Sequence, residues 1–192
     1  MERLLVAVLA GGEGRRMGGL KALRPFRGAP LVAHALAQAR GWSDAVVVAV
    51  RDPAQVAGAV DAPLVTDRPD VAGPLSGLAA AFAHASISGA GLLLTIPCDT
   101  PRLPADLPVR LEAALTPEVL AVLPAANGRL QPACGLWRTC AVELLADYLA
   151  TGGSSLWGFA QACGLATVEF GADPRFANAN TPADLARLEH DP

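Results

Sequence analysis

Apolar residues in this chain gather in short, nearly continuous runs. The runs at 4–10, 45–50 and 91–96 end at glycine, arginine and proline, respectively. Runs of this length without strict apolar–polar alternation are typical of strands that are buried on both faces of a parallel sheet. We therefore predict three core strands at these positions. Shorter extended segments are expected at 23–26, 63–66, 119–123 and 166–170.

Helical segments are predicted between these strands. Helices are expected at 30–40, 53–60, 75–85, 139–150 and 154–163, and two more begin near Pro104 and Pro182. Gly41 is expected to end the first, Thr139 to cap the helix that follows it, and Thr181 to cap the last. The order of elements predicts an α/β fold with one domain, 1–192, built on a mostly parallel open sheet with helices on both faces.

One segment departs from simple strand–helix alternation. Asn127-Gly128 is a strong signal for a two-residue turn, and 129–137 then reads as the returning strand of a hairpin. The polar face of this strand carries Gln131.

Composition limits the partners that the chain can have. The net charge is −3 and the isoelectric point is near 5.6, so bulk charge suggests neither a nucleic acid nor an anionic membrane. The first apolar run is too short to span a bilayer, and we predict neither a signal peptide nor a membrane anchor. The four cysteines have no metal-ligand spacing; we expect buried, reduced thiols and a cytoplasmic protein.

The segment after the first strand is rich in glycine and positive charge. Five of the nine residues at 11–19 are glycine, and Arg15, Arg16 and Lys21 lie within or beside them. Glycine allows a close approach of the backbone, so successive N–H groups can converge on an anion. We therefore predict a triphosphate cradle at the carboxyl end of the first strand, the usual place for ligands in open α/β sheets.

This loop is open to other interpretations. Ala22 follows Lys21, so the loop lacks the Gly-Lys-Ser/Thr ending of a Walker A motif. The third glycine of a dinucleotide fingerprint would fall at Met17, which makes that interpretation weak. An ordinary glycine-rich turn with surface arginines remains an alternative.

Two further segments carry candidate chemistry. Asp99 follows the strand at 91–96 between two prolines, where its carboxylate can face the same crevice as the glycine loop and hold Mg²⁺. A cap of the next turn is the alternative role. The segment 73–78, Gly-Pro-Leu-Ser-Gly-Leu, opens a helix; Gly77 within that helix favours a close approach, although an ordinary strand-to-helix turn is equally compatible.

Taken together, Leu9-Ala10-Gly11-Gly12, Arg16-Met17-Gly18 and Lys21 resemble the signature of nucleotidyltransferases that pass a nucleoside monophosphate to an acceptor phosphate. Within that group the chain most resembles the molybdenum cofactor guanylyltransferases, and the resemblance extends to Gly-Pro-Leu-x-Gly and Asn-x-Asn-Thr-Pro. It implies a Rossmann-like nucleotidyltransferase fold, Mg²⁺, and transfer of GMP from GTP to molybdopterin with release of pyrophosphate. It also implies contacts with other molybdenum cofactor biosynthesis or acceptor proteins.

The resemblance and the chemistry of the glycine-rich loop together assign roles to individual residues. Arg16, Lys21 and Asp99 would be catalytic, with Asp99 also holding the metal. Asn178 and Asn180 would contact the acceptor, and the polar face of the predicted hairpin strand adds Gln131 as a further acceptor contact. The nucleotide would be bound by Leu9, Ala10, Gly11, Gly12, Gly14, Arg15, Lys21, Asp67 and Asp99.

Two departures from the family pattern bear on base recognition. Leu20 stands where many relatives have Asp, and Val48 is the position expected to replace a nucleotide-contacting Asn. The Gly-Gly pair at 11 and 12 resembles the guanine-using branch, whereas Ala-Gly marks relatives that use CTP. A CTP-using molybdopterin cytidylyltransferase, a sugar-phosphate nucleotidyltransferase and a non-catalytic nucleotide- and molybdopterin-binding adaptor remain as alternatives.

Overall fold

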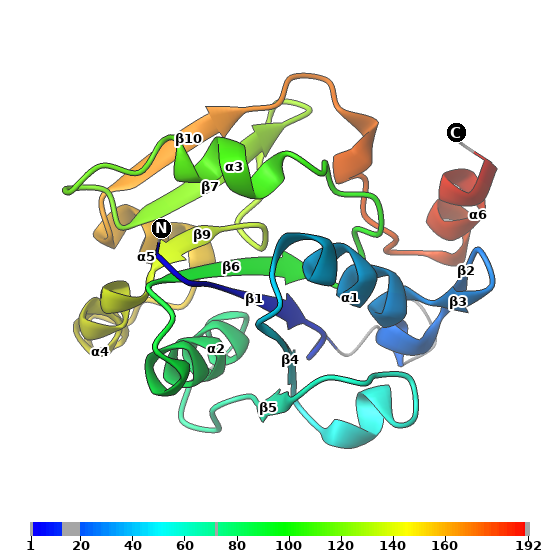
Figure 1. Cartoon of the computed structure of the whole chain (residues 1–192), viewed down its shortest axis with the longest axis horizontal. Helices are drawn as coiled ribbons and strands as arrows, with labels where there is room; N and C mark the ends of the chain where they lie inside the picture. The colour runs from blue at the N-terminus through cyan, green and yellow to red at the C-terminus, as the bar shows by residue number, and fades with distance from the viewer. Residues whose placement is uncertain (1, 13–19, 72, 191–192) are drawn as a thin grey trace.

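A twisted, mostly parallel sheet forms the centre of the computed structural model, which describes residues 2–12, 20–71 and 73–190 (Figure 1). The strand order is β10-β7-β9-β6-β1-β4-β5, with β8 paired to β7 beside this path. The strands are β1 Leu4–Leu9, β4 Val46–Val50, β5 Leu64–Thr66, β6 Leu92–Pro97, β7 Ala121–Ala126, β8 Arg129–Leu130, β9 Leu136–Arg138 and β10 Leu165–Glu169. A separate two-stranded ribbon pairs β2 Pro25–Phe26 with β3 Ala29–Pro30.

The inner strand β1 is parallel to both of its neighbours. Val8 lies opposite Val48 of β4 and Ile96 of β6, and β5 continues the parallel set beyond β4. The strands β1, β4, β5 and β6 therefore end at the same edge of the sheet. β9 runs antiparallel to both β6 and β7, and β10 is parallel to β7.

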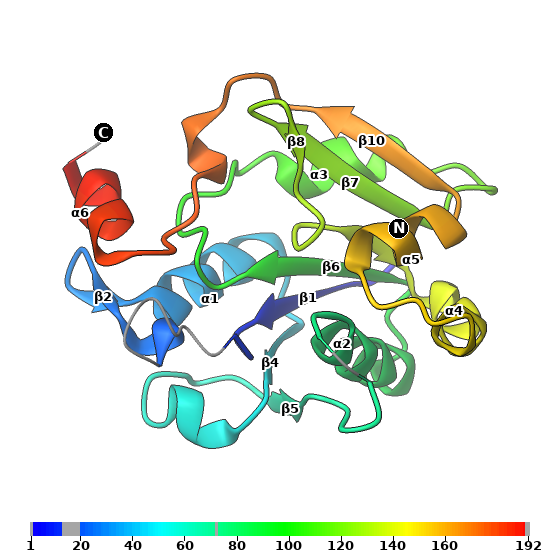
Figure 2. The same ribbon diagram turned by 180° about the vertical axis from the view of Figure 1, so that it is seen from behind.

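Helices cover both faces of this sheet, as the two opposite views show (Figures 1 and 2). α1 and α3 pack on one face, and α2, α4 and α5 pack on the other. α6 lies beside the β2–β3 ribbon. The α-helices are α1 Leu31–Trp42, α2 Leu75–Ser88, α3 Leu107–Glu112, α4 Leu145–Ala150, α5 Leu156–Ala162 and α6 Pro182–His190. Short 3-10 helices are η2 Lys21–Leu23, η3 Pro53–Val56, η4 Thr139–Leu144 and η5 Pro174–Phe176.

The apolar strands divide their side chains between two cores. In β1, Val6 and Val8 face α1, whereas Leu5 and Ala7 face α2. Both sets are buried, which explains why the run shows no alternation of apolar and polar residues. On the α2 side, the rings of Trp137 and Phe159 stack with their centroids 5.7 Å apart.

A smaller apolar cluster anchors the last helix. Leu185 and Leu188 of α6 pack with Phe26 of β2 and Leu31 of α1. Thr181 starts the helix: the Asp184 amide donates to the Thr181 hydroxyl at 3.1 Å, and the Thr181 amide donates to the Asp184 carboxylate at 2.9 Å. This reciprocal cap confirms the predicted helix start. The cluster also holds the segment before α6 against the carboxyl edge of the sheet.

The α/β class, the mostly parallel sheet and the helices on both faces are confirmed, but several local predictions are wrong. The first helix continues through Gly41 to Trp42. The segment 53–60 forms only the 3-10 turn η3, and 139–150 begins as 3-10 helix η4, so Thr139 does not cap an α-helix. The predicted strand 129–137 divides into β8 and β9, because 131–135 leaves the β7 ladder.

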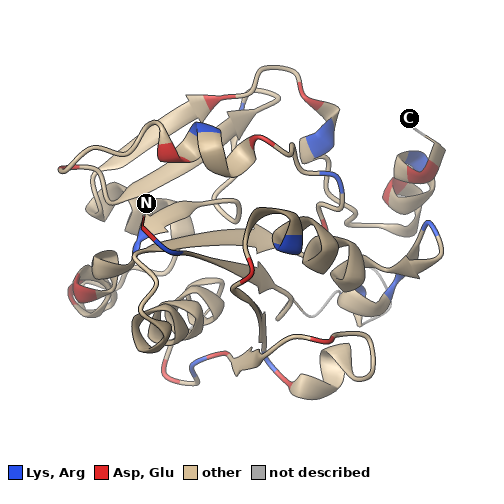
Figure 3. Ribbon diagram, viewed as in Figure 1, with Lys and Arg blue, Asp and Glu red and all other residues tan. Residues whose placement is uncertain are grey.

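Charged residues are dispersed along the ribbon, with blue and red positions interspersed in the view of Figure 3. None of the helices in the described part of the chain is long and apolar enough to cross a membrane. Among the cysteines, Cys98, Cys134 and Cys163 are buried, but Cys140 is exposed, contrary to the expectation that all four thiols are buried.

Candidate active site

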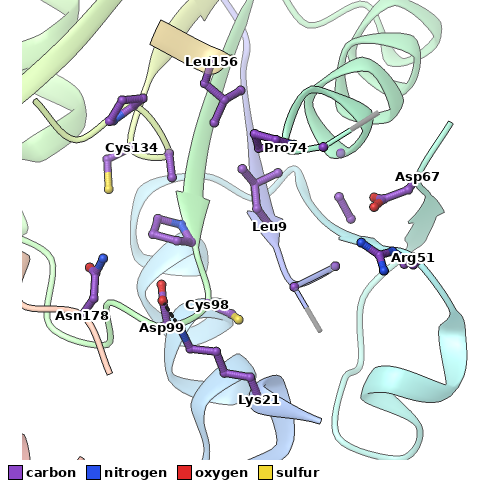
Figure 4. A pocket seen from close by; sticks show the side chains of 18 of the residues that line it. Leu9, Lys21, Arg51, Asp67, Pro74, Cys98, Asp99, Cys134, Leu156 and Asn178 are labelled. Atoms are coloured by element: carbon purple, nitrogen blue, oxygen red, sulfur yellow. Dashed lines mark hydrogen bonds and ion pairs between the residues drawn. The ribbon is translucent and has the colours of Figure 1, made fainter. Parts of the chain in front are cut away.

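A cavity of about 560 Å³ opens at the carboxyl edge of the parallel strands. This volume is within the usual range for sites that bind small molecules and cofactors. Figure 4 shows Asp67 and Arg51 together on one side of the cavity, Lys21 and Asp99 together below Leu9, and Cys134 and Asn178 on the opposite side. The cavity therefore has two charged regions joined by the end of β1.

Lys21 and Asp99 form an ion pair in the first of these charged regions. The Lys21 ammonium donates to the Asp99 carboxylate, and the two side chains are 14% and 15% exposed. Lys21 Nζ also donates to Asn180 Oδ1 at 2.7 Å. Residues that are far apart in the sequence thus meet at one point, and the ammonium group is held at the cavity wall by two acceptors.

The backbone around Asp99 is fixed by its neighbours on two sides. The Cys98 amide donates to the Leu9 carbonyl at 3.1 Å, which continues the β1–β6 ladder to the cavity. The Ala179 amide donates to the Asp99 carbonyl at 2.8 Å, and the Thr100 hydroxyl donates to Asn178 Oδ1 at 2.7 Å. The segment before α6 therefore braces the loop that presents Asp99.

In the second charged region, Asp67 carries a hydrogen-bond acceptor that no described residue uses. Its amide donates to the Val50 carbonyl at 2.8 Å, which fixes the residue just beyond β5. Asp67 Oδ1 is buried without a hydrogen-bond partner among the described residues. Burial raises the pKa of this carboxyl above its ordinary value, and the positive charge of Arg51 opposes that rise. A ligand with N–H donors would satisfy this oxygen.

Two glycines leave space beside Asp67. A Cβ on Gly11 would lie 2.8 Å from Asp67 Oδ2 and 3.3 Å from the Arg51 backbone nitrogen. A Cβ on Gly77, inside α2, would lie 3.4 Å from both Asp67 Oδ1 and a Leu9 methyl. Gly11 therefore cannot carry a side chain without moving Asp67, and Gly77 brings α2 close to the cavity.

The remaining wall is mostly apolar. It is formed by Pro132, Ala133, Cys134 and Leu156, with Gln131 and Asn178 adding polar groups. Burial raises the pKa of the Cys98 thiol to about 12, and raises that of Cys134 as well. Both thiols are thus neutral at physiological pH and act here as small apolar groups.

The structure brings together most of the residues that the sequence singled out. Leu9, Gly11, Gly12, Lys21, Asp67, Asp99, Gln131 and Asn178 all line the cavity. Asn180 accepts a hydrogen bond from Lys21, which itself lines the cavity, whereas Ala10 is buried in the core on the α1 side. Gly14, Arg15 and Arg16 lie outside the described residues. These placements are geometric, and the individual roles remain predictions.

Val48, the position expected to replace the family's nucleotide-contacting Asn, does not line the cavity. Its side chain is buried in the core beneath α1, and the neighbouring Ala49 lines the cavity. Leu20 is 54% exposed with a φ of 45°, a left-handed conformation that Asp adopts more readily than Leu.

Sequence reasoning missed Arg51, which also lines the cavity. A usable signal was present: it is the first polar residue after a fully buried strand, at the edge where ligands bind.

The acidic side chains of the site can be compared with the ligands that a divalent metal ion requires. Within the described residues, no group of three or more His, Cys, Asp or Glu side chains is arranged to hold a metal ion. Mg²⁺ in nucleotide enzymes is commonly bound through one or two carboxylates together with substrate phosphates. Asp99 offers a single carboxylate to a cavity that is large enough for a nucleotide. This arrangement fits a Mg²⁺ ion that is bound by one carboxylate together with substrate phosphates.

Solved structures share this fold. Molybdopterin-guanine dinucleotide biosynthesis protein A from Archaeoglobus fulgidus gives a TM-score of 0.74 at 23% identity, with 96% of each chain covered. The 2-C-methyl-D-erythritol 4-phosphate cytidylyltransferase from Thermus thermophilus gives a TM-score of 0.68 at 21% identity, with 97% of each chain covered. The chain therefore shares the fold of these two proteins.

Sequence comparison identifies the class of protein. Residues 6–163 match the model of the MobA-like NTP transferase domain, so the chain is a nucleotidyltransferase. A molybdenum cofactor guanylyltransferase of Cereibacter sphaeroides is 41% identical over 97% of this chain and 96% of the relative. One of Cupriavidus metallidurans is 37% identical over 93% and 90%, respectively. The chain belongs to the MobA-like NTP transferase family and, within it, to the molybdenum cofactor guanylyltransferases.

Proposed function

We propose that this enzyme transfers GMP from GTP to the terminal phosphate of molybdopterin and releases pyrophosphate. The observation that supports this most directly is the division of one cavity between Asp67, with its unused buried acceptor, and the Lys21–Asp99 pair. A guanine base carries adjacent N–H donors that suit a carboxylate, and a triphosphate needs cations. The guanylyltransferase relatives give the same substrate class.

The reaction requires little acid–base chemistry. The acceptor phosphate monoester is largely dianionic at neutral pH, so one of its oxygens can attack the α-phosphorus without prior loss of a proton. A new P–O bond forms as the bond from the α-phosphorus to the bridging oxygen breaks, and the bonding electrons leave with pyrophosphate. The obstacle is repulsion between anions, so alignment and charge neutralisation dominate catalysis.

Each region of the cavity has a task in this scheme. Lys21 neutralises phosphate charge, with Asn180 holding its ammonium group at the cavity wall. Asp99 would hold Mg²⁺, which would supply further neutralisation of the phosphate charge. Asp67 accepts hydrogen bonds from the base, and the backbone at Gly11 and Gly12 approaches the phosphates without interference from side chains.

The acceptor is assigned to the remaining wall. The mostly apolar surface around Pro132 and Leu156 can cover a flat ring system, while Gln131 and Asn178 offer hydrogen bonds to its polar edge. This assignment puts the acceptor phosphate beside Asp99, between the apolar wall and the nucleotide phosphates. Asn180 is assigned to Lys21, so its contribution to the acceptor is indirect.

The experiment is a measurement of pyrophosphate release from GTP and Mg²⁺ with and without molybdopterin. We expect release that depends on the acceptor and falls at least tenfold in both Lys21→Ala and Asp99→Ala. Binding of GTP with no release of pyrophosphate would support the adaptor hypothesis. A panel of GTP, CTP, ATP and UTP in a thermal-shift assay tests the base, because the preferred nucleotide stabilises the folded protein most. Greatest stabilisation by CTP would favour a cytidylyltransferase.

A further inference from the structure

Arg51 occupies a position from which it can read the same base as Asp67. It follows β4 directly, and its amide donates to Gln55 Oε1 at 2.9 Å, which ties the residue to the η3 turn. Its side chain lines the cavity beside Asp67, and the two charged groups lie close together in Figure 4. The neighbouring Ala49 has only a methyl group, so no larger side chain from β4 separates a ligand from Arg51.

The walls beside this pair suit a flat ligand. Leu9, Ala49 and Pro74 present apolar surface, and Gly11 and Gly77 lack side chains. A planar base can therefore enter edge-on toward Asp67 and Arg51 with its faces against apolar groups. The charged groups of Asp67 and Arg51, at the end of this part of the cavity, then determine which edge of a base can bind.

The two charged groups together match guanine better than the other bases. Guanine has two adjacent donors, N1–H and the 2-amino group, which suit a carboxylate, and two adjacent acceptors, O6 and N7, which suit the fork of a guanidinium. In adenine, the acceptor N1 would face the Asp67 carboxylate, which is also an acceptor. Its 6-amino donor would face the Arg51 guanidinium, which is also a donor. Cytosine and uracil have no N7.

We infer that Arg51 is a specificity-determining residue that donates to O6 and N7 of guanine while Asp67 accepts from N1–H and the 2-amino group. This inference rests on the proposed use of GTP and adds a second reader of the base. Arg51 acts on binding of the nucleotide and touches no reacting atom. Its loss lowers discrimination between bases more than it lowers turnover at saturating GTP.

The test combines protein variants with altered bases. 7-deaza-GTP lacks the N7 acceptor, and ITP lacks the 2-amino donor; dissociation constants for GTP and both analogues are measured by titration calorimetry with Mg²⁺. The wild-type protein is expected to bind 7-deaza-GTP about tenfold more weakly than GTP, the usual size of discrimination by a bidentate pair. Arg51→Ala should bind GTP and 7-deaza-GTP equally, yet still bind ITP more weakly because Asp67 is retained.

Two control variants separate charge from geometry. Arg51→Lys keeps the charge without the fork and should discriminate less than threefold against 7-deaza-GTP. Arg68→Ala removes an exposed arginine that pairs with Asp70 outside the cavity, and should keep the wild-type ratio. Equal wild-type affinity for GTP and 7-deaza-GTP, or unchanged discrimination in Arg51→Ala, would overturn the inference. The proposed function fails separately, if the wild-type enzyme releases no pyrophosphate from GTP and molybdopterin.

Discussion

Gly11→Ala adds one methyl group beside Asp67 and perturbs the proposed base site. The added methyl carbon would lie 2.8 Å from Asp67 Oδ2, whereas ordinary contacts begin near 3.4 Å. The Arg51 backbone nitrogen, at 3.3 Å, limits relief by movement of the methyl group in its direction. The flexible partner is the Asp67 side chain, so the carboxylate must rotate away from its present position.

The expected magnitudes follow from this rotation. A side chain forced off its preferred rotamer costs about 1 kcal/mol, which in a chain of this length lowers Tm by about 2–4 °C. Loss of hydrogen bonds to a charged acceptor costs about 1.5–3 kcal/mol, so the Kd for GTP should rise about 10- to 150-fold. The variant should therefore remain folded and lose affinity for guanine nucleotides.

The assay is titration calorimetry with GTP and Mg²⁺, with a thermal melt of each protein. Gly12→Ala is the control for the folded state: a Cβ on Gly12 would meet none of the described residues within 4 Å, so Tm should not change. A Gly11→Ala protein that binds GTP within threefold of the wild type would refute the reasoning. Retained affinity would mean that Asp67 does not read the base from its present position.

Three further predictions concern charge and capping. Lys21→Ala should lower kcat for pyrophosphate release at least tenfold with a near-normal circular dichroism spectrum; near-normal kcat would contradict its role. Asp67→Asn should raise Tm by about 2 °C at pH 7, because the raised pKa means that the folded state disfavours the charged carboxylate. This gain should vanish below pH 3.8, where the carboxyl is protonated in both states; a gain that persists there would exclude desolvation as the cause. Thr181→Ala should lower Tm by about 2–4 °C through loss of the α6 cap without changing the KM for GTP, and an unchanged Tm would argue against the cap.

The sequence was sufficient for the features that depend on local patterns. The buried strands follow from apolar runs, and the α6 start follows from Thr181, Pro182 and Asp184, whose side chains act on backbone groups a few residues away. The position of Asp99 at the cavity follows from its place after a parallel strand. Such features need only short-range geometry and the rule that parallel strands end together.

Long-range packing determined what could not be predicted. The hydrogen bond from Lys21 to Asn180 joins residues at opposite ends of the chain, and no local signal encodes it. The split of 129–137 into two strands depends on β9 fitting between β6 and β7. Val48 faces the core beneath α1 whereas Ala49 lines the cavity, because successive side chains of a strand point to opposite faces of the sheet, and the apolar run alone does not show which face meets the ligand.

A structure of the enzyme with GTP and Mg²⁺ tests the central claim most directly. The account predicts that the guanine edge lies against Asp67 and Arg51 and that the phosphates lie beside Lys21 and Asp99, all within the cavity at the strand ends. A bound GTP with its base on the Pro132 and Leu156 wall, or outside the cavity altogether, would contradict it.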